Sequence, residues 1–149
     1  MNSDPGGRLA LLQSMATVRA YSFDGFLIVC GRTAQDNEQL SLKTARQGDL
    51  WFHARGVSGS HVLLLRDPAH PFSKTAVQVA ASLAAHFSKY RAAGTCPISC
   101  CDGGLVGKTR GLATGTVTIR GERVIKVRPQ IPEEIAGLQA LSDREDPTV

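Results

Sequence analysis

The apolar residues of the N-terminal part come in short runs that turn-forming residues separate, which is typical of β-strands. Residues 18–23 alternate between apolar and polar, and residues 26–30 form a continuous apolar run. Asp24 and Gly25 lie between the two runs, and both residue types tolerate the positive φ angles of a tight turn. The pattern therefore predicts a β-hairpin over residues 18–30.

A short helix and two strands are expected next. Residues 33–45 form the helix, which Thr33 or Asp36 caps. Residues 50–54 and 61–66 form the strands, on either side of a glycine-rich bend. Because the second strand contains a continuous apolar stretch, it should be buried on both faces.

The clearest helix is predicted over residues 73–93, where small and apolar residues recur at helical spacing. Ser73 is its expected N-cap, and Gly94 ends it. Lys89 and Arg91 would then lie in its last turns, where the helix dipole favours cations.

The C-terminal part should add a strand over residues 97–101, a second hairpin over residues 116–127 and a short acidic helix over residues 133–141. This order indicates an α+β fold: a mostly antiparallel (mixed) sheet of about six or seven strands, with one long helix packed on one face and a short helix. The expected organisation is a flexible N-terminal arm (1–17), a folded domain (18–129) and an acidic C-terminal tail (130–149).

The composition is that of an ordinary globular protein: of the 149 residues, 42% are hydrophobic and 20% are charged. No apolar run approaches the roughly 18 residues that cross a bilayer, and the N-terminus makes a poor secretory signal. We therefore expect a cytoplasmic protein without a membrane partner, in which all four cysteines stay reduced.

Charge is divided unevenly along the chain. Residues 1–129 contain 16 basic and 8 acidic side chains, whereas residues 130–149 contain 1 and 5. A body this basic suits a polyanionic partner, because each phosphate contact releases condensed counterions. Nucleic acid is therefore a candidate partner, although many small soluble proteins are equally basic without binding it.

The densest cluster of side chains suited to binding surrounds the glycine-rich bend. Trp51, His53 and Arg55 alternate, so they should project from one face of a strand. Ser60 and His61 follow the bend. An exposed row of this kind would offer stacking surfaces and a cation to looped or single-stranded RNA. For Trp51 alone a position in the core is slightly favoured; for the two histidines and Arg55 together, a surface site is the better interpretation.

Two catalytic alternatives use the same region. A metal-dependent hydrolase would combine His53 and His61 with the cysteines of residues 96–101. The spacing of these cysteines lacks the Cys-x2-Cys pair that is typical of structural zinc sites. A serine hydrolase would pair Ser60 with His61, yet neighbours on a strand point to opposite faces. We therefore expect a non-catalytic protein without a metal or other cofactor.

A glycine-rich loop over residues 103–115 is the second candidate site. The tripeptide that begins at Gly107 matches the end of a phosphate-binding loop, but Asp102 stands where that motif requires its first glycine. A helix should also follow, and a β-rich stretch follows instead. We reject a nucleotide-hydrolysing loop, although Lys108 and Arg110 still suit contacts with a phosphate backbone.

In this order the segments resemble the NFACT-R domain, the C-terminal RNA-binding domain of NFACT ribosome-associated quality-control factors. The resemblance covers about residues 18–129. Its most specific part is Trp51-Phe-His followed by Gly59-Ser-His, and Asn37-Glu38 and Lys108 also match. The glycine-rich loop over residues 103–115 is poorer in Lys, Arg and Pro than in the family, which indicates weaker binding of phosphate.

The resemblance implies non-catalytic binding of structured RNA, with tRNA and the large ribosomal subunit as partners. A larger protein that supplies the missing NFACT segments is a further expected partner. The expected RNA-binding residues are Trp51, His53, Arg55, Ser60, His61, Lys89, Lys108 and Arg110. A protein-interaction adaptor that docks through the acidic tail is the remaining alternative.

Overall fold

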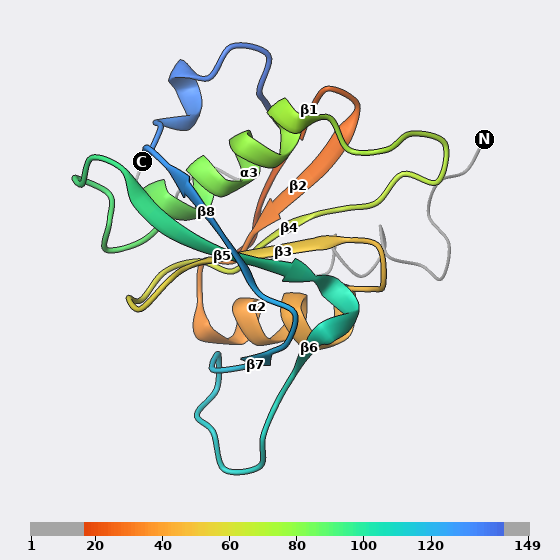
Figure 1. Ribbon diagram of the computed structural model, residues 1–149, viewed down its shortest axis with the longest axis vertical. Coiled ribbons are helices and arrows are strands. Elements are labelled where there is room, and N and C mark those ends of the chain that lie inside the picture. The colour runs from red at the N-terminus through yellow and green to blue at the C-terminus, as the bar shows by residue number, and fades with distance from the viewer. Residues whose placement is uncertain (1–16, 142–149) are drawn as a thin grey trace.

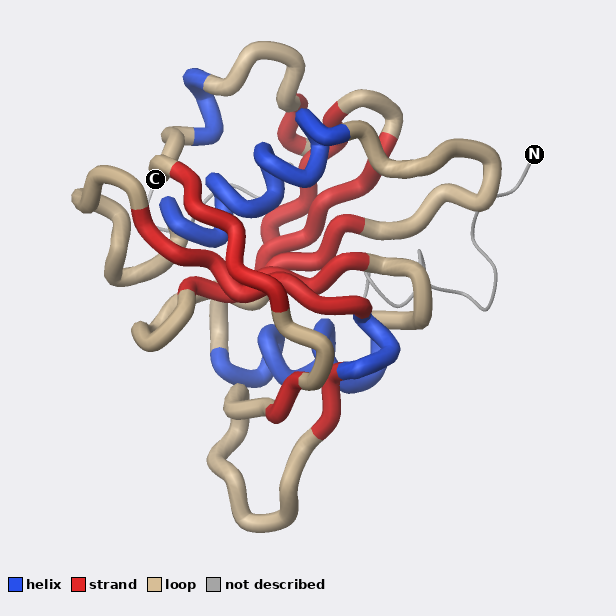
Figure 2. The backbone as a smooth tube through the Cα atoms, viewed as in Figure 1, coloured by secondary structure: helices blue, strands red, loops and turns tan. Residues whose placement is uncertain are grey.

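The computed structural model describes residues 17–141, which form an antiparallel sheet with helices on both of its faces (Figures 1 and 2). The sheet has seven strands in the order β8-β5-β3-β4-β2-β1-β9, and β6 and β7 form a separate two-stranded sheet. The predicted α+β fold is confirmed. The strands are β1 (Arg19–Phe23), β2 (Phe26–Cys30), β3 (Leu50–Ala54), β4 (Val62–Leu64), β5 (Cys96–Asp102), β6 (Val106–Gly107), β7 (Thr118–Ile119), β8 (Arg123–Val127) and β9 (Gln139–Ala140).

The first hairpin is present as predicted. Phe23 of β1 pairs with Phe26 of β2. Asp24 has a φ of 54° and Gly25 a φ of 82°, and these positive values match the twist of the two strands.

Alternation along the central strands divides the apolar side chains between two cores. Phe52 and Ala54 of β3 pack beneath α3 (Lys74–His86) on one face of the sheet. Trp51 packs on the opposite face, in a cluster that includes Leu63 and Leu40. All residues of β4 are fully buried, so the prediction of a strand covered on both faces is confirmed.

The short helix covers the second face and begins where the sequence predicts. It consists of α2 (Ala34–Gln39), which continues directly into a π-helix, η2 (Leu40–Thr44). Thr33 and Asp36 form a reciprocal capping box: the Thr33 hydroxyl accepts from the Asp36 N–H, and the Asp36 carboxylate accepts from the Thr33 N–H. The side chain of Leu40 anchors this helix in the core.

The long helix begins as predicted but ends earlier. Ser73 caps it by accepting from the Ala76 N–H, and the helix stops at His86 rather than near residue 93. The backbone beyond that point bonds to the glycine-rich bend instead: Phe87 accepts from the Ser60 N–H at 2.9 Å, and the Lys89 N–H donates to Ser58 at 3.0 Å. Lys89 and Arg91 therefore lie in a turn outside the helix, which corrects their predicted place in its last turns.

The predicted hairpin over residues 116–127 is wrong. β7 pairs with β6, whereas β8 pairs along five residues with β5 at the edge of the main sheet. The Arg120 N–H donates to Leu105, and Gly121 turns the chain from one sheet to the other with a φ of 68°. Long-range pairing with β5 therefore replaces the local pairing.

The predicted helix over residues 133–141 is also wrong. A single 3-10 turn, η4 (Pro132–Glu134), precedes β9, which adds to the outer edge of β1. Ile135 and Leu138 pack against the core beneath α3. The expected N-terminal arm lies outside the described residues, apart from Thr17. Within residues 17–141, no helix has both the length and the apolar character that crossing a bilayer requires.

We predict that Phe52→Ala lowers the free energy of unfolding by about 3–5 kcal/mol, because it leaves a cavity between β3 and α3. Urea unfolding followed by circular dichroism measures this difference. Val124→Ala, at a side chain that is 39% exposed on β8, is the control and should change the value by less than about 0.5 kcal/mol. Equal losses in both variants would contradict the buried position of Phe52 beneath α3.

Candidate functional site

A cleft of about 980 Å³ opens beside the end of β3. Its walls are the glycine-rich bend (residues 55–59), the start of α2, residues 114–117 and the turn after α3, and its floor carries Trp51, His53 and His61. Three basic side chains line it: Arg32, Arg55 and Lys89. Among the described residues, no carboxylate belongs to the lining.

The floor is a cluster of three rings, two from β3 and one, His61, that directly precedes β4. The Trp51 and His53 rings stack with their centroids 5.9 Å apart, because residues two apart on β3 share a face. The His61 ring meets each of them edge-on, with centroids 5.1 Å from both. The result is a continuous aromatic surface whose members hold one another in place.

A buried hydroxyl connects two of these rings. Ser41 accepts a hydrogen bond from Trp51 Nε1 at 2.8 Å, and its Oγ lies 2.6 Å from His61 Nδ1. Because a hydroxyl has one proton and two lone pairs, Ser41 can accept from the indole and still either donate to His61 Nδ1 or accept from it, according to the tautomer of that ring. In both cases one hydroxyl serves two buried rings.

Burial keeps both imidazoles of the floor neutral. Burial, with a smaller contribution from nearby His53, lowers the pKa of His61 to about 3. Burial also lowers the pKa of His53. The floor therefore carries no charge at neutral pH, and its rings interact through stacking and hydrogen bonds.

His53 is the ring most suited to meet a ligand. It is only partly buried, and neither ring nitrogen has a hydrogen-bond partner among residues 17–141. A neutral imidazole offers one donor and one acceptor. Both remain available at the cleft floor.

The expected exposed row of aromatic and basic side chains needs correction. Trp51 is 2% exposed and occupies the core position that was slightly favoured for it. His61 is 4% exposed, so the surface interpretation is wrong for this residue; the helix α2 and the segment after it cover it, and Asn37 Oδ1 accepts from its N–H. Ser60 is also buried and donates to Gly31 at 2.6 Å. These residues shape the floor and are not an outer surface.

The cations of the cleft differ in their partners. Arg55 has a side chain that is 57% exposed and lies 3.5 Å from the carboxylate of Glu122. Lys89 is exposed, and no described residue forms an ion pair with it. Arg32, at the start of α2, was not among the predicted binding residues, because only the folded chain brings it to the cleft.

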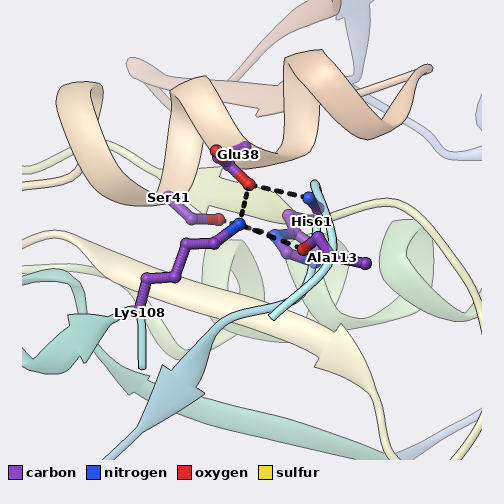
Figure 3. A network of polar contacts seen from close by, with 6 residues as sticks. Glu38, Ser41, His61, Lys108 and Ala113 are labelled. Atoms are coloured by element: carbon purple, nitrogen blue, oxygen red, sulfur yellow. Dashed lines mark hydrogen bonds and ion pairs between the residues drawn. The ribbon is translucent and has the colours of Figure 1, made fainter. Parts of the chain in front are cut away.

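Lys108 anchors the glycine-rich loop rather than projecting from it (Figure 3). Its Nζ donates to the Glu38 carboxylate and, at 3.0 Å, to the Ala113 carbonyl. Glu38 also accepts from the Gly115 N–H at 2.9 Å, and the hydrogen bond from Lys108 holds its pKa below the ordinary value. This network holds residues 114–117 against the cleft. Arg110 lies exposed on the loop and does not line the cleft.

Ser41 and Asn37 are functional side chains that the sequence analysis missed or left without a role. Ser41 gives no local signal, since it is one polar residue in a short helix. Asn37 matches the family motif, and the structure gives the reason: its Oδ1 accepts from His61 N–H at 3.0 Å. Gly31 is required nearby, because any Cβ there would collide with Asn37.

The residues of the metal-dependent alternative do not converge. Phe52 pairs with Cys100, so Cys100 and Cys96 face α3, on the side of the sheet away from His53 and His61. Cys101 shares the histidine face but is buried beside Trp51. Within the described part of the chain, no group of three or more His, Cys, Asp or Glu residues could hold a metal ion.

Comparisons with known proteins agree with the sequence motifs. The family model of the NFACT protein RNA-binding domain matches residues 16–121. The chain is 35% identical over 103 residues to an Rqc2 homolog RqcH of Streptococcus suis and 31% identical over 108 residues to that of Bacillus subtilis. These matches cover 69% and 72% of this chain but 18% of each relative.

A solved structure shares the fold. It is the C-terminal part of the fibronectin/fibrinogen-binding protein from Streptococcus suis, with a TM-score of 0.70 and 33% sequence identity. The superposition covers 76% of this chain and 46% of that one.

We predict that acid destabilises the protein partly through His61. Its folded pKa of about 3 lies below the ordinary value of about 6.5, so between these values the unfolded chain binds more protons and stability falls as the pH falls. The contribution of this group is up to about 1.4 kcal/mol per pH unit. Urea unfolding from neutral pH to about pH 4 should show a shallower decline in His61→Gln than in the wild type. His70→Gln, at an exposed position, should leave the decline unchanged; an unchanged decline in His61→Gln would contradict the buried neutral ring.

Proposed function

Because this chain belongs to the NFACT protein RNA-binding domain family, we propose that its cleft binds structured RNA without catalysing a reaction. The RNA is tRNA, or ribosomal RNA of the large subunit, and the setting is ribosome-associated quality control in the cytoplasm. The chain spans 18% of the length of its RqcH relatives, and a larger protein partner is a further part of this proposal.

The observation that carries the proposal is the division of the cleft into a neutral aromatic floor and a basic rim. Arg32, Arg55 and Lys89 surround the floor, without a carboxylate among the described lining residues. Phosphate contacts from such cations supply affinity, and aromatic surfaces receive unpaired bases.

Each part of the cleft has a distinct role in this proposal. His53 meets the base, because its ring is partly exposed and its nitrogens lack partners in residues 17–141. Trp51 and His61 support His53 from below and from the side. Lys108 acts as a positioning residue, since Glu38 already neutralises its charge and its bonds hold the loop wall. Arg110 reaches phosphate only beyond the cleft.

We predict that Arg55→Ala and Lys89→Ala each weaken tRNA binding and flatten its salt dependence. Each lost phosphate contact should reduce the slope of log Kd against log salt by roughly 0.7–0.9. Filter binding over a salt series measures both quantities. Lys74→Ala, which removes an exposed cation at the other end of α3, should match the wild type. If the wild type retains no tRNA and no large subunits at low ionic strength, the proposed function is excluded.

We predict that His53→Ala weakens RNA binding by about 1–2 kcal/mol, roughly 5- to 30-fold, without changing the salt slope, because a neutral ring contributes stacking and no charge. Affinity should also stay constant between about pH 7 and pH 8, because burial lowers the pKa of His53 from its ordinary value of about 6.5 and the ring is neutral throughout that range. His70→Ala is the matched control on an exposed loop. Wild-type affinity in His53→Ala would show that the RNA does not reach the cleft floor.

A further inference from the structure

A second hollow lies on the other side of Phe87. It has a volume of about 510 Å³, and Arg19, His86, Arg91 and Glu133 are among the residues that line it. Phe87 lines both the cleft and this hollow. The two recesses are therefore neighbours that meet at Phe87.

The turn between the recesses is fixed to the wall of the cleft. Phe87 accepts from the Ser60 N–H at 2.9 Å, the Lys89 N–H donates to Ser58 at 3.0 Å, and Tyr90 donates its hydroxyl proton to the Arg55 carbonyl at 2.7 Å. These bonds fix the backbone of the turn, from which Lys89 lines the cleft and Arg91 lines the hollow.

The hollow repeats the chemistry of the cleft. The Arg19 guanidinium lies 4.4 Å from the centroid of the Phe87 ring and forms a planar wall. The His86 ring packs edge-on against Phe87, with centroids 4.7 Å apart; it is 6% exposed, and no described residue hydrogen-bonds to it. Arg91 is exposed and has no ion-pair partner within residues 17–141. Each recess therefore combines a planar surface, an imidazole with open hydrogen-bonding capacity and a cation.

We propose that the hollow is a second nucleotide site on the same RNA strand, so that a single strand passes over Phe87 from the cleft and places its next phosphate on Arg91. This proposal rests on the proposed function of the cleft. An unpaired strand fits, because its bases can turn into separate recesses, whereas the bases of a duplex face inward. Guanidinium planes and aromatic rings both accept stacked bases.

Glu133 limits the affinity of this second site. Its carboxylate is the one acidic group among the described residues that line the hollow, and it repels phosphate. Removing this charge therefore has an effect opposite to that of removing Arg91, which gives the experiment two variants with opposite expected signs.

The test compares oligouridylates of different length by fluorescence anisotropy. A dinucleotide fills the cleft alone, and an octanucleotide spans both recesses. For the octanucleotide, Arg91→Ala should weaken binding about tenfold and reduce the salt slope by about 0.7. Glu133→Gln should strengthen it, and Arg91→Lys should restore most of the affinity. For the dinucleotide, all three variants should bind within about twofold of the wild type, as should Lys74→Ala for both probes.

The outcomes separate this inference from the function on which it rests. If the wild type binds neither probe nor tRNA at low salt, the proposed function fails. If the wild type binds the octanucleotide but Arg91→Ala and Glu133→Gln match Lys74→Ala, the second site is excluded and the cleft remains. An acidic peptide that binds the hollow and does not compete with the octanucleotide would also exclude it.

Discussion

The cleft depends on the buried hydroxyl of Ser41. This one hydroxyl accepts from the indole of Trp51 on β3 and also hydrogen-bonds to the imidazole of His61, which follows the bend. Both rings are almost fully buried, and an unpaired polar atom in such a place costs about 1–3 kcal/mol. The hydroxyl offsets that cost for two rings at once. It also holds both rings as a support beneath His53.

Because helices cover both faces of the sheet, few side chains of its central strands can contact solvent or a ligand. The central strands β3 and β4 lie between α3 and the helix formed by α2 and η2, so their middle residues are core. Only the ends of the strands and the bends beyond them are open. The charges accordingly come from bends and turns, with Arg55 after β3 and Lys89 after α3, while the strands supply uncharged rings. A charge on the floor would require desolvation that the fold does not compensate.

The glycine-rich loop reaches the cleft through a network that is distant in sequence. Glu38 of α2 hydrogen-bonds to both Lys108 and the backbone of Gly115, which joins the loop to the helix. Gly115 adopts a φ of 88° and packs against Ala34, where a side chain would be both strained and crowded. Lys108, which the motif alone would assign to phosphate binding, thus holds the loop in place. The loop contains few other basic residues, which fits a role in shaping the cleft better than a role in binding phosphate.

Local patterns in the sequence determined the first hairpin, the capping box at Thr33, the central strands and the face that Trp51 and His53 share, because adjacent residues decide turns, caps and alternation. Tertiary structure decided the rest. The C-terminal limit of α3 and the partner of β8 depend on backbone groups far away in the chain. The burial of His61 depends on the helix that carries Asn37 and Ser41. Ser41, Arg32 and Glu38 belong to the site only because the fold carries α2 over the floor, and no local signal marks a residue for such a position.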